Sequence, residues 1–266
     1  MPPKKAFRTK SSTPTTPPTW PPLHPRLASE KQRLTSLLSS QIITTPLFPI
    51  PLAATYRSFL ASLPLTVVPQ TRKKDHALRL NDRFSVQDPA FAAQLWSSTG
   101  LSDLVTSGLI DGENLSEADR TKLWGGEPIG LNPNIRVYRY REGHYFEKHY
   151  DEENLLPFEL DKADGSKEKV QGRTTWTLLI YLSGPATGCE GGETVFYPED
   201  ESMGGFGKGS AKGNGIEEMM KNKVVASMEV GMALLHKHGR DCLLHEGRQV
   251  KNGEKWVIRS DLVVKR

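Results

Sequence analysis

The spacing of apolar residues predicts helices in the first half of the chain. Apolar residues three and four positions apart predict one helix within Ala28–Ile42 and a second over Leu52–Leu63. Asp88 is suited to cap a third helix, because its carboxylate can accept free backbone N–H groups, and Pro89 fits the first helical position. The segment beginning at Ser116 resembles a capping box and predicts one further short helix.

From residue 134 onward the apolar pattern has a period of two, which is typical of strands. Short runs bounded by polar or glycine-rich turns predict strands at Ile135–Tyr140, Thr174–Leu182, Glu193–Tyr197, Lys223–Met228, Gly231–His236 and Lys255–Val264. Helices followed by many short strands indicate an α+β chain whose second half is a β-sandwich or jelly roll. We therefore expect one folded domain, 29–266, with mainly helical support over 29–133 and a β core over 134–266.

Two long polar inserts interrupt the predicted strands, at Glu152–Arg173 and Glu199–Asn222. Loops of more than about 12–15 residues without secondary structure are usually functional lids or disordered segments. We expect at least one of these two inserts to act as a lid or to control substrate access.

Proline and basic residues are concentrated in the first 28 residues. This segment contains eight of the 19 prolines, five lysines and arginines, and no acidic residue. Such a composition buries too little apolar surface to fold, so we expect 1–28 to be a disordered tail. Subtracting its five charges from the formal net charge of +4 leaves −1 for the remainder. The folded part therefore offers no case for nucleic acid as a partner.

Three features of the sequence bear on the cellular location of the protein. It contains no apolar run of the roughly 18–20 residues that a membrane span requires. The tail lacks the apolar stretch of a secretory signal. The only cysteines, Cys189 and Cys242, fit a reducing compartment. We expect a cytoplasmic or nuclear protein that is not secreted and has no membrane partner. The basic, Ser/Thr-rich tail leaves a mitochondrial location open.

His149 and Asp151 form the sharpest chemical signal. Residues i and i+2 of an extended strand point to the same side, so this pair can present an imidazole and a carboxylate to one metal ion. His236, His238 and His245 are the candidates for a third ligand. Two imidazoles and one carboxylate form the facial triad of non-haem Fe(II) oxygenases, which leaves positions open for co-substrate and O2. Alone the pair is weak evidence, because His and Asp two residues apart occur in many proteins.

Four further motifs surround this pair. A tyrosine precedes it by nine residues, within NIRVYRYREGHYFEKHYD; a TxLxYL strand and an EGGET turn follow; and in HEGRQVKNGEKWVIRSDLVV a lysine comes ten residues after a histidine. This combination resembles the prolyl 4-hydroxylase-like branch of the 2-oxoglutarate/Fe(II) dioxygenases, from about Arg79 to residue 266. The resemblance implies a double-stranded β-helix (jelly roll) core with supporting N-terminal helices. It also implies Fe(II) and 2-oxoglutarate as cofactor and co-substrate, and ascorbate as a reductant.

The resemblance implies that His149, Asp151 and His245 hold the iron. His245 is the preferred third ligand because Lys255 lies ten residues on, across a turn at 251–253, and a hairpin of that size would return the lysine toward the metal. The distal carboxylate of 2-oxoglutarate, when buried, needs a cation, because an unpaired buried charge is very costly. We expect Lys255 to be that cation. His236 and His238 stay open as alternative ligands, although neither has a lysine at the same distance.

Three further residues are candidates for the co-substrate pocket. By resemblance, Tyr140 and Thr177 are expected to hydrogen-bond the distal carboxylate; their alternative role is ordinary core packing. Arg259 lies four residues after Lys255 on the same strand face. It is expected to line the pocket, to assist Lys255, or to pair elsewhere. The Asn81–Arg83 segment also resembles a stretch of family members and is a candidate for facing the substrate.

The function implied by the resemblance is hydroxylation of a protein or small-molecule substrate, with O2 consumed and succinate and CO2 released. Prolyl residues are the first candidate target. Nucleic-acid demethylation is disfavoured, because the branch that performs it carries arginines six residues apart, whereas Arg259 and Arg266 are seven apart. The alternative is a catalytically inactive jelly-roll metal- or ligand-binding module, although such proteins usually lose a ligand or the lysine. A zinc hydrolase would have no use for Lys255 or Tyr140.

Overall fold

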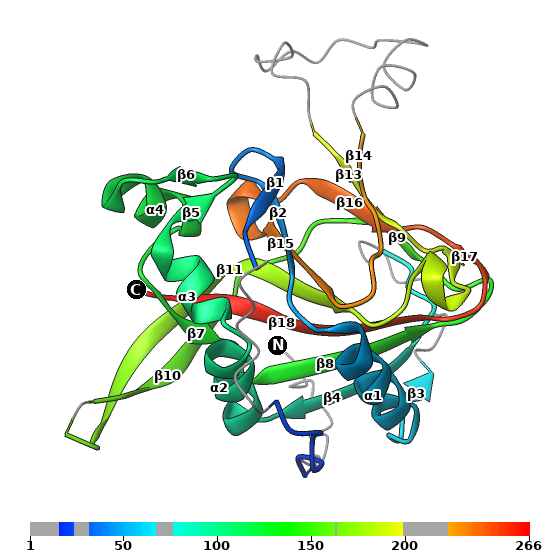
Figure 1. Ribbon diagram of the computed structural model, residues 1–266, viewed down its shortest axis with the longest axis horizontal. Coiled ribbons are helices and arrows are strands. Elements are labelled where there is room, and N and C mark those ends of the chain that lie inside the picture. The colour runs from blue at the N-terminus through cyan, green and yellow to red at the C-terminus, as the bar shows by residue number, and fades with distance from the viewer. Residues whose placement is uncertain (1–15, 24–31, 68–76, 163, 199–222) are drawn as a thin grey trace, which may run out of the picture.

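Two antiparallel sheets form the centre of the protein (Figure 1). The computed structural model describes residues 16–23, 32–67, 77–162, 164–198 and 223–266. The larger sheet has ten strands, whose order is β1 (Thr35–Leu38), β2 (Ile42–Pro46), β15 (Met232–Lys237), β11 (Lys167–Tyr181), β18 (Lys255–Lys265), β8 (Asn134–Tyr140), β4 (Asp82–Gln87) and β3 (Thr66–Val67), with β10 (Leu155–Asp161) beside β11 and β7 (Pro128–Leu131) beside β18.

The smaller sheet has four strands, in the order β14 (Val224–Ala226), β13 (Thr194–Tyr197), β16 (Leu244–Gly247) and β9 (Phe146–His149). Buried side chains from both sheets form one cluster, to which Tyr138 and Leu234 come from the larger sheet and Phe196 from the smaller one. The sheets therefore pack face to face. This mostly β arrangement with few helices is consistent with the expected jelly-roll fold. Two short pairs complete the strands, β12 (Glu190–Gly191) with β17 (Val250–Asn252) and β5 (Leu109–Ile110) with β6 (Glu113–Asn114).

Helices cover the outer face of the larger sheet. They are α1 (Ile50–Ala61), α2 (Pro89–Ser98), α3 (Leu101–Ser107) and α4 (Glu117–Trp124). A second buried cluster contains apolar side chains from these helices together with Ile135 and Ile258 of the sheet. The predicted start of α2 is confirmed, because the Asp88 carboxylate accepts the N–H of Phe91 at 2.9 Å. The predicted start of α4 is confirmed as well: the hydroxyl of Ser116 accepts a backbone N–H at 3.1 Å.

The six strands predicted after residue 134 are confirmed as β8, β11, β13, β14, β15 and β18. The helix predicted within Ala28–Ile42 is wrong for the described residues. They form the β1–β2 hairpin, and β2 pairs with β15 in the larger sheet. The β-branched run Ile42–Thr45, whose side chains are all buried, favours a strand over a helix. The segment 29–133 is therefore of mixed structure rather than mainly helical.

Part of the predicted disordered tail is packed against the domain. The Trp20 ring stacks on Phe91 with centroids 3.9 Å apart, and its indole N–H donates to Asp88 at 2.7 Å. The side chain of Leu23 is buried. The prediction of disorder is thus wrong for 16–23, because two large apolar side chains outweigh the composition of their surroundings; residues 1–15 and 24–28 lie outside the described residues.

The first polar insert is not a loop. Residues Leu155–Asp161 pair in register with Lys167–Arg173, so the insert forms the β10–β11 hairpin, which extends away from the body of the protein (Figure 1). The predicted insert at 199–222 lies outside the described residues. In the part of the chain that the structure describes, no helix is both long and apolar enough to span a membrane.

Candidate active site

His149, Asp151 and His245 meet between the two sheets. Strands β9 and β16 pair so that His149 stands opposite His245, and Asp151 follows two residues after β9. The Nε2 atoms of His149 and His245 each lie 3.8 Å from a carboxylate oxygen of Asp151. The ligand atoms of the three residues all lie within 4.8 Å of one another. The three residues expected to hold iron are therefore brought together.

The two imidazoles are oriented for metal binding. The Nδ1 of His149 lies 2.8 Å from the backbone oxygen of Glu147, and the Nδ1 of His245 lies 2.9 Å from that of Leu243. A carbonyl accepts only, so each Nδ1 carries its hydrogen and each Nε2 keeps a lone pair. Burial, together with neighbouring His245, lowers the pKa of His149 to about 3. Burial also lowers the pKa of His245. Both rings are thus neutral, as ligation requires.

Arg259 and Thr177 hold the carboxylate of Asp151. The guanidinium of Arg259 engages both oxygens, at 2.9 and 3.1 Å, and the Thr177 hydroxyl donates to one of them at 2.8 Å. Burial alone would raise the pKa of Asp151, but Arg259 and the nearby imidazoles hold it well below its usual value. Thr177 therefore lies at the metal end of the site, a position that differs from the predicted one beside the distal carboxylate. Of the three roles left open for Arg259, the structure shows pocket lining and pairing with Asp151.

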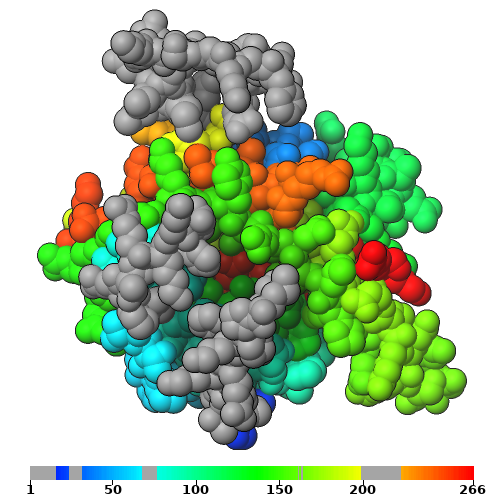
Figure 2. Space-filling model, turned by 180° about the vertical axis from the view of Figure 1, so that it is seen from behind, coloured from blue at the N-terminus to red at the C-terminus, as the bar shows by residue number. Residues whose placement is uncertain are grey.

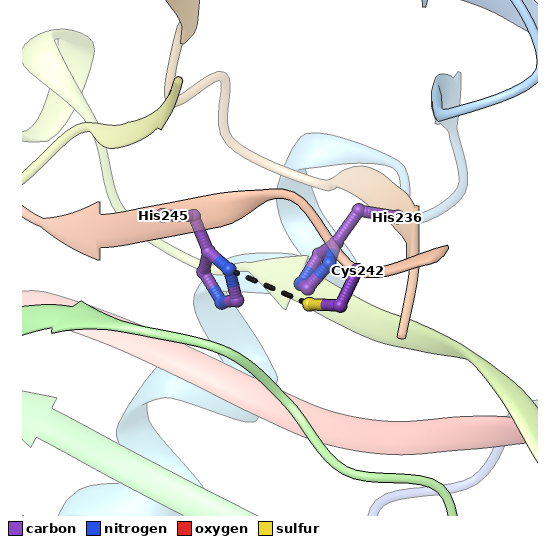
Figure 3. A group of neighbouring side chains, drawn as sticks. All are labelled: His236, Cys242 and His245. Carbon is purple, nitrogen blue, oxygen red and sulfur yellow. Dashed lines mark hydrogen bonds between the residues drawn. The ribbon is translucent and has the colours of Figure 1, made fainter. Parts of the chain in front are cut away.

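His236 and Cys242 lie beside His245, one of the three candidate metal ligands (Figure 3). The Nε2 of His236 is also 3.8 Å from Asp151, and His236, Cys242 and His245 form a second group that could hold a metal ion. The thiol of Cys242 accepts the backbone N–H of Asp151 at 3.2 Å, and burial raises its pKa to about 11. A neutral thiol is a poor ligand, which favours the first group.

His238 is a weaker candidate for the third ligand. Its Nδ1 lies 3.1 Å from the Thr177 hydroxyl and its Nε2 lies 2.9 Å from that of Thr174. Because both ring nitrogens are occupied by hydrogen bonds, His238 is a structural residue.

Lys255 lies at the other end of the same pocket. Its side chain is buried, and its ammonium donates to the backbone oxygen of Gly192 at 2.6 Å. The ammonium is 5.5 Å from the ring centroid of Tyr140 and 5.3 Å from that of Tyr181. Among the described residues no carboxylate pairs with it, and burial lowers its pKa to about 8. A buried cation with donors to spare fits a carboxylate ligand.

One pocket connects the two ends. The three candidate metal ligands, called the metal cluster below, line this pocket, and so does Lys255. Tyr140, Leu179 and Val257 line it as well. Figure 2 shows a hollow on this face of the molecule, with atoms of the red C-terminal strand at its bottom. No residue of the first insert, Glu152–Arg173, lines this pocket, and the lid role expected of at least one insert stays a prediction.

Sequence reasoning missed several residues in or beside the pocket. Tyr181 does not line the pocket, but its ring lies beside Lys255, and its hydroxyl is 2.7 Å from that of Thr194. Tyr181 is the tyrosine of the TxLxYL motif, four residues after Thr177 on the same strand face, so the motif itself carried the signal. Arg79 and Tyr138 do line the pocket. Tyr138 precedes Tyr140 by two residues and could have been found by the same alternation.

Comparison with protein-family models matches residues 135–260 to the 2OG-Fe(II) oxygenase superfamily. The chain carries a 2OG-Fe(II) oxygenase domain. The matched segment contains the three candidate metal ligands and Lys255. The oxygenase is thus an oxidoreductase that uses Fe(II) and 2-oxoglutarate, and the His/Asp cluster is a donor set that suits Fe(II). Comparison with curated protein sequences found no match.

Several solved structures are similar to this chain. A prolyl-4-hydroxylase from Pseudomonas putida is similar over 86% of this chain and 96% of its own, with 11% identity and a TM-score of 0.50. A prolyl hydroxylase from Trichoplax adhaerens, in complex with a hypoxia inducible factor peptide fragment, covers 84% of both chains, with 14% identity and a TM-score of 0.48. A viral collagen prolyl hydroxylase from Paramecium Bursaria Chlorella virus-1, in its 2OG complex, covers 84% of this chain and 96% of its own, with 15% identity and a TM-score of 0.43. At 11% identity, the likeness to the Pseudomonas putida structure concerns the fold alone.

Proposed function

We propose that the oxygenase hydroxylates a protein or small-molecule substrate, consuming O2 and releasing succinate and CO2. The observation that carries this proposal is a single pocket with a two-histidine, one-carboxylate cluster at one end and, at the other, a buried lysine that has no carboxylate partner among the described residues. A metal site at one end of the pocket and a cation at the other match a co-substrate that chelates a metal with one end and carries a carboxylate at the other. Prolyl residues are the first candidate target, because the motifs resemble the prolyl 4-hydroxylase-like branch.

In this proposal His149, Asp151 and His245 hold the iron. Bound iron and 2-oxoglutarate supply the oxidising power for hydroxylation. Arg259 and Thr177 keep the Asp151 carboxylate ionised and oriented, which are the tasks of partners that surround a metal ligand.

Lys255 binds the distal carboxylate of 2-oxoglutarate in this proposal. Tyr140, which lines the same pocket and whose ring lies 5.5 Å from the ammonium, is the hydroxyl donor that the family resemblance implies. Leu179 and Val257 lie in the same pocket and exclude water from it. We further interpret the two sheets as a double-stranded β-helix, because side chains from both of them line the pocket.

The alternative is a jelly-roll module that binds a metal or ligand without catalysis. One observation favours it: Arg259 engages both oxygens of Asp151, one of which must be available to a metal ion. Against it stands the complete set of His149, Asp151, His245 and Lys255, all of them directed into one pocket.

Turnover of 2-oxoglutarate distinguishes the two. Purified protein with Fe(II), O2 and 2-oxoglutarate is expected to form succinate, and His149→Ala is expected to form none above background. Lys255→Ala is expected to retain the metal but lose the co-substrate, whereas Lys251→Ala, which changes an exposed lysine four residues earlier, serves as the matched control. A wild-type protein that binds metal but forms no succinate in the presence of peptide and metabolite pools supports the inactive module. Products heavier by one oxygen atom in those pools identify the substrate.

A further inference from the structure

Arg79, which lines the pocket, and Arg83, which lies near the pocket residue Tyr138, have no carboxylate partner among the described residues. The guanidinium carbon of Arg79 lies 5.1 Å from the ring centroid of Tyr138 and 4.9 Å from that of Phe146. The guanidinium carbon of Arg83 lies 5.9 Å from the same Tyr138 ring. Arg79, Tyr138 and Phe146 all line the pocket that contains the metal cluster. Both guanidinium groups therefore lie near the ring of Tyr138, on the same side of the site.

Neighbouring arginines behave differently. Arg136 pairs with Asp261, Arg139 and Arg141 both pair with Asp82, and Arg259 pairs with Asp151. Pairing with a carboxylate is thus the rule on these strands, and Arg79 and Arg83 are exceptions among the residues that the structure describes.

The excess of positive charge shifts the pKa values of nearby groups. Burial raises the pKa of Tyr138, yet the guanidinium groups of Arg259, Arg136, Arg79 and Arg83 outweigh burial and lower it below its ordinary value. Burial lowers the pKa of Arg83. Neighbouring Tyr138 opposes this shift, whereas repulsion from Arg79, Arg136 and Arg259 adds to it. An anion bound here would relieve this repulsion.

Asn81 lies between the two arginines in the sequence and adds an independent observation. Its side chain is 1% exposed, and within the described part of the chain neither its amide nitrogen nor its amide oxygen has a hydrogen-bond partner. Buried amides are nearly always hydrogen-bonded, so a buried side-chain amide without a partner indicates that a ligand supplies its hydrogen bonds. In extended chain, residues 79, 81 and 83 fall on one side, which puts Asn81 on the side of the two guanidinium groups.

We propose that Arg79, Arg83 and Asn81 bind an anionic group of the substrate, so that the substrate is a molecule bearing a carboxylate or a phosphate-like oxyanion near the carbon that is hydroxylated. This inference rests on the proposed function. The proposed anion site differs from the co-substrate site. On β8, Tyr140 pairs with Lys255 and Tyr138 pairs with Arg83. Tyr138 and Tyr140 are two residues apart, which separates their positions along the strand by roughly 7 Å. The carboxylates of 2-oxoglutarate are assigned to the metal and to Lys255, which leaves these arginines to another anion.

Titration with inorganic sulfate tests the site without knowledge of the substrate. The full chain is loaded with Mn(II) and saturating 2-oxoglutarate, and sulfate binding is measured by calorimetry at an ionic strength held constant with chloride. Saturable binding is expected in the wild type, with affinity reduced at least 10-fold in Arg79→Gln and in Arg83→Gln. Arg79→Lys is expected to stay within about 3-fold of wild type, because the charge is kept. Arg240→Gln, which changes an exposed arginine outside the pocket, is the matched control.

Three results of the titration would overturn the inference. One is the absence of saturable binding to the wild type. Another is equal sulfate affinity in the wild type and in both glutamine variants. The third is competition between sulfate and 2-oxoglutarate, which would put the anion at Lys255.

A second arm addresses the substrate itself. Peptide and metabolite pools are separated by anion exchange, and each fraction is screened for products heavier by one oxygen atom. Products are expected from the retained, anionic fraction, with substrate KM raised at least 10-fold in Arg79→Gln. Products from the unretained fraction alone would overturn the inference while leaving the proposed function intact. Failure of the wild type to turn over 2-oxoglutarate would instead reject the proposed function, and the sulfate titration would still decide whether the anion site exists.

Discussion

His149 and His245 stand opposite each other on the antiparallel strands β9 and β16, with ring centroids 4.2 Å apart. This pairing brings together two imidazoles that are 96 positions apart in the sequence. Because Asp151 follows His149 by two residues, its carboxylate lies beside both rings. The register of one strand pair thus determines the geometry of the whole metal site.

Replacement of either histidine is expected to weaken metal binding strongly. Loss of even an outer partner of a metal ligand typically costs 10–100-fold in affinity, so His149→Ala and His245→Ala are each expected to lose at least about 100-fold. Affinity for Mn(II), measured by electron paramagnetic resonance, checks this. His238→Ala is the comparison: its ring nitrogens bond to threonine hydroxyls, so metal affinity is expected to fall far less. Equal losses in His238→Ala and His245→Ala would contradict the assignment.

Lys255 is expected to make the stability of the metal-free protein depend on pH. Burial lowers its pKa from the ordinary 10.5 to about 8, so between these values the unfolded chain binds more protons than the folded one. Stability therefore rises as the pH increases from about 8 to 10.5, by roughly 3 kcal/mol from this group. Urea unfolding of the wild type and of Lys255→Met at pH 7.5 and 10 measures the difference between them. The same slope in both proteins would show that Lys255 is not responsible.

The same lysine is expected to govern co-substrate affinity. Removing one partner of a buried ion pair costs about 3–5 kcal/mol, which corresponds to roughly 100-fold or more in the Kd for 2-oxoglutarate. Calorimetry on Mn(II)-loaded Lys255→Ala checks this value, with Lys251→Ala as control. An affinity loss of less than about threefold would mean that another group holds the distal carboxylate.

Arg259 is expected to maintain metal binding at mildly acidic pH. Burial favours the neutral form of Asp151, and Arg259 is the largest influence that opposes it. In Arg259→Gln the pKa of Asp151 should therefore rise, and metal affinity should fall as the pH decreases from 7 to 5, when the carboxylate becomes protonated. Mn(II) titrations at both pH values measure this. A parallel pH dependence in the wild type and the variant would contradict the role given to this ion pair.

The contact of Trp20 with Phe91 predicts that the amino-terminal segment stabilises the domain. Trp20 stacks on Phe91 and donates a hydrogen bond to the cap of α2. Trp20→Ala is expected to lower the free energy of unfolding by roughly 2–3 kcal/mol, somewhat less than for a fully buried tryptophan. Urea unfolding measures it, and a change below about 0.5 kcal/mol would show that the contact contributes little.

The chemistry of the site was predictable where it depends on short spacings. His149 and Asp151 are two residues apart, and Lys255 follows His245 by ten, so local strand geometry suffices to relate the members of each pair. The strands after residue 134 were predictable for the same reason, because their alternating pattern records which face is buried. The helix over Leu52–Leu63 and the cap at Asp88 were also readable from local residues.

Other features depend on pairings between distant strands, which sequence spacing does not specify. Thr177 lies next to Asp151 because β11 passes beneath the metal cluster, and no local pattern indicates this. Residues near Ile42 form a strand because β15 is available to pair with them. Arg79 was overlooked because its relevance comes from the rings of Tyr138 and Phe146, which belong to two different sheets.

A crystal structure of the protein with Mn(II) and 2-oxoglutarate, grown without O2 and without added iron, is the most direct test. We expect one metal ion bound by His149, Asp151 and His245, with the distal carboxylate within hydrogen-bond distance of the Lys255 ammonium. A metal ion held instead by His236 and Cys242, or a co-substrate whose carboxylate lies away from Lys255, would contradict it.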